Sequence, residues 1–177
     1  MTMRSIFLAL SLSVIAAGCA TPYKPNLAGQ PSANIRMLSN HTRISWAGLL
    51  KDACVPSTTF GWESGSDNIG QLTARSNPRR TSIGMPLQEI PAETAFIETA
   101  VPANSPISVG FSTLGLFHVQ ACGAGIQFTP QQGADYQVTY NGESAMSCSI
   151  SVSKIVKTPE GAVVLEPVPN ASVLPRC

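Results

Sequence analysis

The second half of the sequence alternates apolar and polar residues in short runs bounded by turn-forming residues. Apolar side chains recur at every second position within residues 107–112, 122–128 and 136–140. A period of two puts successive side chains on opposite faces of a β-strand, so each run predicts a strand with one buried face. Turns about every ten residues are typical of sandwiches and barrels. We therefore expect an all-β domain, either a β-sandwich or an open barrel of short antiparallel strands.

Further strands are expected in the rest of the chain, at residues 33–38, 43–47, 94–100, 148–154 and 162–165. Residues 46–53 leave a short helix open as an alternative, because their apolar spacing fits either period.

Two connections stand out between these strands. Residues 56–82 are rich in Gly, Pro, Ser, Thr and Asn, which predicts a long loop. Asn141-Gly142 predicts a tight hairpin, because both residue types tolerate positive φ.

Four of the five cysteines lie beyond the N-terminal region, at Cys54, Cys122, Cys148 and Cys177. An even set in an exported chain favours two disulfides. Cys122 opens one predicted strand and Cys148 lies on the second strand after it, so we predict that these two pair. Cys54 and Cys177 would then pin the C-terminal tail to the domain. Zinc is the alternative, but no pair has the CxxC spacing of such sites, and no metal or other cofactor is expected.

The N-terminus has the pattern of an export signal. Arg4 precedes an apolar run at residues 6–17, which ends in Ala-Ala-Gly-Cys at residues 16–19. Small residues before a cysteine predict cleavage after residue 18 and lipidation of Cys19; an ordinary secretory signal is the alternative. Residues 19–32 would then form a tether, and residues 33–177 a single periplasmic domain. No acidic residue follows Cys19, so we expect a lipid anchor in the periplasmic face of the outer membrane.

The charge balance excludes one class of partner. The chain has 11 basic and 10 acidic residues, and Arg4 leaves with the signal, so the mature chain is formally neutral. Nucleic-acid-binding domains usually carry a strong positive field, so no nucleic acid is expected as a partner.

Residues suited to catalysis are few. His41 and His118 are the only histidines, and the sequence has neither a G-x-S-x-G motif nor a phosphate-binding glycine loop. Glu89, Glu93 and Glu98 are interpreted as an exposed acidic edge. We expect a non-enzymatic protein.

The strongest basic cluster is Arg75, Arg79 and Arg80, within the predicted loop. Clustered arginines can contact an anionic partner, so this cluster is the candidate partner-binding site. A solvated loop is the simpler alternative.

Several motifs together resemble a family of small Gram-negative outer-membrane lipoproteins, most of them uncharacterised. The similarity rests on the pattern at Cys19, the proline-rich turn at residues 101–106, and Phe128-Thr129-Pro130 with Tyr136 between Cys122 and Cys148. The resemblance implies a β-sandwich envelope domain and supplies no catalytic residues. Because a sandwich presents edge strands and end loops as binding surfaces, we expect a protein that binds an envelope protein or peptidoglycan. The alternative is a lysozyme-inhibitor-like module, since Tyr140-Asn141-Gly142 is similar to the hairpins of such inhibitors.

Overall fold

A computed structural model describes residues 25, 27–40, 44–56, 66–72, 80–86, 89–114, 120–142 and 147–177. These residues form strands, turns and bends, and no helix occurs among them. The strands are β1 (Ser32–Ser39), β2 (Ser45–Leu50), β3 (Ser66–Leu72), β4 (Arg80–Thr81), β5 (Ala95–Pro102), β6 (Ile107–Leu114), β7 (Gln120–Phe128), β8 (Asp135–Gly142), β9 (Cys148–Lys157), β10 (Val163–Pro167) and β11 (Ser172–Val173).

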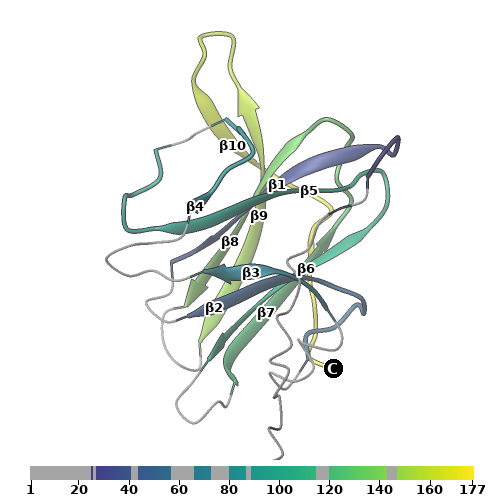
Figure 1. Ribbon diagram of the computed structural model, residues 1–177, viewed down its shortest axis with the longest axis vertical. Coiled ribbons are helices and arrows are strands. Elements are labelled where there is room, and N and C mark those ends of the chain that lie inside the picture. The colour runs from purple at the N-terminus through teal and green to yellow at the C-terminus, as the bar shows by residue number, and fades with distance from the viewer. Residues whose placement is uncertain are drawn as a thin grey trace, which may run out of the picture.

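The strands form two sheets packed face to face (Figure 1). Sheet A has six strands in the order β10-β9-β8-β1-β5-β4, and sheet B has five in the order β11-β7-β6-β2-β3. This arrangement confirms the predicted β-sandwich. Two pairings are parallel, β1 with β8 and β4 with β5, whereas antiparallel strands were expected throughout. β1 lies between β5, with which it pairs antiparallel, and β8, with which it pairs parallel.

The core lies between the sheets and is built from their alternating inner faces. Tyr136, Val138 and Tyr140 all point into it from β8, as their spacing predicted. Tyr140 stacks on Phe111 of the opposite sheet with ring centroids 5.2 Å apart, and Phe128 packs against Tyr136 at the same distance. These aromatic pairs join sheet A to sheet B and fix which face of each strand is buried.

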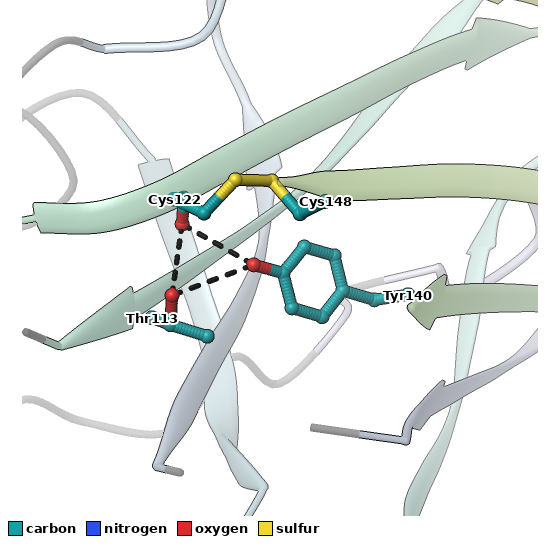
Figure 2. Close-up of a disulfide and its surroundings, with 4 residues drawn as sticks. All are labelled: Thr113, Cys122, Tyr140 and Cys148. Carbon is teal, nitrogen blue, oxygen red and sulfur yellow. Dashed lines mark hydrogen bonds between the residues drawn. A yellow bond between two sulfur atoms is a disulfide. The ribbon is translucent and has the colours of Figure 1, made fainter. Parts of the chain in front are cut away.

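Both predicted disulfides are present, Cys54–Cys177 and Cys122–Cys148. Cys122 and Cys148 link β7 of sheet B to the start of β9 in sheet A. Figure 2 shows that the hydroxyl of Tyr140 points toward this bond, and it donates to the carbonyl oxygen of Cys122 at 3.3 Å. Thr113 donates to the same oxygen at 3.1 Å. The link therefore lies beside a small polar group within an otherwise apolar core.

Three local predictions were wrong. The stretch at residues 56–82 contains β3 and β4, so it is not a single loop. β8 and β9 do form an antiparallel pair as the predicted hairpin requires, but Asn141 and Gly142 are paired residues at the end of β8 and not its turn. The register that places Tyr140 opposite Ile150 in the core decides this, and it outweighs local turn preference. The helical alternative at residues 46–53 also fails, because β2 runs to Leu50 and a bend follows.

Candidate partner-binding site

A buried ion pair lies on the outer face of sheet A. Arg36 of β1 and Glu98 of β5 are directly paired in register, and both side chains are fully buried. Nε and Nη2 of Arg36 donate to Oε1 of Glu98 at 2.8 and 2.6 Å. Nη2 also donates to the carbonyl oxygen of Pro86 at 2.9 Å. Burying a charged pair is costly unless its other polar atoms are bonded, and Nη1 of Arg36 has no hydrogen-bond partner among the described residues.

Residues 80–86, here called the cover segment, satisfy the other carboxylate oxygen. Oε2 of Glu98 accepts hydrogen bonds from the hydroxyl of Ser82 at 2.7 Å and from the amides of Ile83 and Met85 at 2.8 and 3.3 Å. Gly84 adopts a φ of +91°, which lets the amides on either side of it face the same oxygen. Glu98 therefore fixes the cover segment onto the sheet.

The hydrogen bonds to Glu98 also set its protonation. Burial raises the pKa of this carboxyl, but hydrogen bonds from Ser82, Arg36 and the two amides outweigh burial and hold the pKa below its ordinary value of 4.5. Glu98 is thus ionised at neutral pH. Interpreting it as part of an exposed acidic edge was wrong, although Glu89 and Glu93 are exposed as expected. The difference arises because Glu98 occupies a strand position that faces the cover segment.

Arg80, the described member of the predicted basic cluster, is exposed, and its guanidinium bonds to main-chain groups of its own domain. Its Nε donates to the carbonyl oxygen of Thr94 at 3.2 Å, and its Nη2 donates to that of Pro91. The guanidinium lies over the ring of Phe96, 5.6 Å from the centroid, and so does that of Arg36. Arg80 therefore holds β4 against the turn before β5. Arg75 and Arg79 lie outside the described residues, so a partner contact by the cluster stays a prediction.

Next to the end of the cover segment lies a shallow groove of about 580 Å³. Pro86 forms one wall, the turn after β7 a second, and the β9–β10 hairpin a third. The lining residues are Pro86, residues 131–135, residues 154–157 and Glu166. Lys154 donates to the side-chain oxygen of Gln131 at 2.8 Å across the groove. Two lysines and two carboxylates give the groove a mixed charge, which suits a polar main chain better than a strongly charged ligand.

The hairpin beside the groove projects beyond the rest of the sandwich (Figure 1). β9 pairs with β8 only as far as Ile155, whereas it pairs with β10 out to Lys157. β10 is the last strand of sheet A, so one of its edges has no neighbour among the described strands. Its side chains are half-buried or exposed, and Val164 is 37% exposed. An open edge of this kind offers main-chain hydrogen-bonding groups to another strand.

The remaining predicted site residues are placed as follows. Cys19, His41 and His118 lie outside the described residues. The ion pair and the projecting hairpin were missed as site features from sequence. A usable indication was present for the ion pair, since Arg36 lies between two apolar residues and Glu98 follows two others. No group of three side chains suited to a metal occurs among the described residues. Within that same part of the chain, no helix is long and apolar enough to cross a membrane.

Comparison with known proteins supplies no family for this chain. No family model matches the sequence, and no curated protein matches it.

Proposed function

We propose that this chain is a lipid-anchored, non-enzymatic protein of the bacterial cell envelope that binds a protein partner. Two disulfides support an oxidising compartment, which agrees with the export pattern ahead of Cys19. A lipid on Cys19 and residues 20–32 would hold the domain at the periplasmic face of the outer membrane.

The projecting β9–β10 hairpin is the observation that carries the proposal. A partner segment in extended conformation adds to the free edge of β10 as a further antiparallel or parallel strand. Strand pairing at this free edge ends at Glu166 and Pro167, because the charge of Glu166 opposes pairing and Pro167 has no N–H to donate. The open stretch is therefore Val163, Val164 and Leu165, which gives the partner strand a short, defined register.

The groove favours a protein over a cell-wall glycan. Val164 lies on the same face of β10 as Glu166, one of the residues that line the groove. Side chains of a docked strand alternate, so those on this side reach the groove and meet both lysine amines and carboxylates. A peptide has groups that complement both charges. A glycan strand lacks the regularly spaced main-chain N–H and C=O groups that add to a sheet edge.

Photocrosslinking in intact cells tests the proposed site. A photoreactive phenylalanine analogue replaces Val164, and the matched control carries it at Val173, which is 68% exposed on β11 at the edge of the other sheet. We expect a discrete protein adduct from position 164 and a much weaker one from position 173. Equal adducts at both positions, or none at 164, would contradict binding at the hairpin.

Two further measurements separate the parts of the proposal. Labelled palmitate should enter the wild-type chain and not Cys19→Ser; incorporation that survives the substitution rules out the anchor. Mixing the purified protein with lysozyme tests the inhibitor alternative. If lysozyme loses activity in the mixture, lysozyme inhibition becomes the better-supported function, and partner binding at the hairpin is rejected.

A further inference from the structure

The C-terminal tail crosses from sheet A to sheet B and covers an edge there (Figure 1). After β10 it runs to β11, where Ser172 and Val173 pair with Gln127 and Ile126 of β7. The amide of Leu174 then donates to the carbonyl oxygen of Gly125 at 2.8 Å. Residues 172–177, here called the C-terminal strap, thus occupy the edge of β7.

The strap is held by a small apolar cluster that is separate from the main core. Leu174 packs against Leu50 and Val55. Gly125 lies directly beneath, and a Cβ at this position would come within 2.8 Å of a methyl group of Val55 and 3.2 Å of one of Leu174. Only glycine leaves room for the strap to lie this close to β7.

Beyond Leu174 the strap is joined to the segment that follows β2. Val55 donates its amide to the carbonyl oxygen of Pro175 at 2.8 Å, and the amide of Cys177 donates to that of Val55 at 3.0 Å. The disulfide between Cys54 and Cys177 closes this junction. Two hydrogen bonds, one short apolar contact and one covalent bond therefore hold the end of the strap.

The two disulfides differ in accessibility. Cys54 and Cys148 are both half-buried, but their partners differ, because Cys177 is exposed and Cys122 is 2% exposed. Disulfide exchange needs a thiolate to reach a sulfur atom in line with the bond, so exposure decides which disulfide reacts first.

We propose that the C-terminal strap is a redox-sensitive device, in which reduction of Cys54–Cys177 by an external dithiol releases residues 172–177 and uncovers the edge of β7. The thiolate of the dithiol attacks Sγ of Cys177 to form a mixed disulfide, and the thiolate of Cys54 leaves and takes up a proton. The second thiol of the reductant then displaces Cys177. The protein gains two thiols, and the dithiol is oxidised to its own disulfide.

Release follows from the weakness of the remaining contacts. Each ordered residue loses backbone freedom on folding. Among the described residues, this loss is offset by the pairing of β11 with β7, three further main-chain hydrogen bonds and the apolar contact of Leu174. While the disulfide is intact, it limits how far a detached strap can move from β7, and reduction removes this limit. Cys122–Cys148 remains intact, so the aromatic core keeps the sandwich folded. This proposal does not depend on partner binding at the β9–β10 hairpin.

Selective reduction of the folded, oxidised protein tests the device. The protein is incubated with dithiothreitol without denaturant, free thiols are alkylated at intervals, and each cysteine is quantified by peptide mass spectrometry. We expect Cys54 and Cys177 to be alkylated at least tenfold faster than Cys122 and Cys148. Amide hydrogen exchange is then measured on the partly reduced protein.

The exchange data report directly on the strap. The amides of Val55, Leu174 and Cys177 should exchange at least tenfold faster after reduction, while those of β8 stay protected. The double variant Cys54→Ser/Cys177→Ser should show the same rapid exchange before any reductant is added. Reduction of both disulfides at one rate, or unchanged protection of these three amides in the reduced wild type, would overturn the proposal whether or not the variant folds.

Discussion

Replacing Glu98 with Gln tests whether the buried ion pair fixes the cover segment. The two side chains have nearly the same shape, but one carboxylate oxygen becomes an NH2 group. In the wild type, one oxygen accepts from Arg36 and the other accepts from Ser82, Ile83 and Met85. Apart from the Ser82 hydroxyl, which can also accept, the neighbours of the carboxylate only donate, so the new NH2 group faces donors in either orientation.

The size of the effect follows from the two orientations. With the amide oxygen toward Arg36, the amides of Ile83 and Met85 lose their acceptor, at about 1–3 kcal/mol each. With the oxygen toward the cover segment, a buried guanidinium has no counter-charge, which costs about 3–5 kcal/mol when one partner of a buried pair is removed. Across the two orientations, Glu98→Gln should lower the free energy of unfolding by about 2–6 kcal/mol.

Urea unfolding at pH 7, followed by the fluorescence of the two tryptophans, measures this loss. The exposed Glu93 is the matched control, and Glu93→Gln should change stability by less than about 0.5 kcal/mol. Adding Arg36→Met to Glu98→Gln should recover at least half of the loss, because the uncompensated charge is then gone. A loss below about 1 kcal/mol for Glu98→Gln, or no recovery in the double variant, would refute the assignment.

Three other outcomes follow from the same contacts. Because the pKa of Glu98 is lowered, its stabilisation is complete above pH 4.5 and is lost as the pH falls toward that lowered pKa. The difference in unfolding free energy between wild type and Glu98→Gln, measured by urea unfolding, should therefore stay constant from pH 6 to 8 and shrink at pH 3. Cys122→Ser/Cys148→Ser should lower the free energy of unfolding by about 3–4 kcal/mol in the same assay, since the bond closes a loop with a sequence separation of 26. An unchanged free energy would show that the bond does not restrict the unfolded chain. Gly125→Ala should cost about 1–3 kcal/mol through overpacking and should speed hydrogen exchange at Leu174, whereas unaltered exchange would contradict the close packing beneath the strap.

Local pattern was sufficient to predict much of the sandwich. Inward-facing residues of β8 and β9 recur at every second position, so the buried faces of Tyr136, Val138 and Ile150 followed from spacing alone. Cys122 and Cys148 lie on predicted strands, and this placement predicted their pairing correctly. In contrast, Asn141-Gly142 carried a strong local turn preference that the core register overrode.

The candidate site depended on contacts that no local pattern contains. Arg36 and Glu98 are 62 residues apart in the sequence, and they meet only because β1 and β5 pair in one register. A charged residue in an apolar strand indicates a special position, but it does not identify the partner or the segment that covers it. Glu98 was wrongly predicted to be exposed because the sequence does not show that the cover segment lies over it.

The sequence by itself determined the all-β class and the alternating faces of the later strands, because both depend on a short period. The cysteine count favoured two disulfides, and the predicted strands that carry Cys122 and Cys148 indicated their pairing. Only the tertiary structure decided that β1 lies between β5 and β8, that a charged pair is buried under the cover segment, and that the β9–β10 hairpin projects with an open edge. These features depend on which distant strands become neighbours. Packing of the whole core selects those neighbours, and local residue preferences do not.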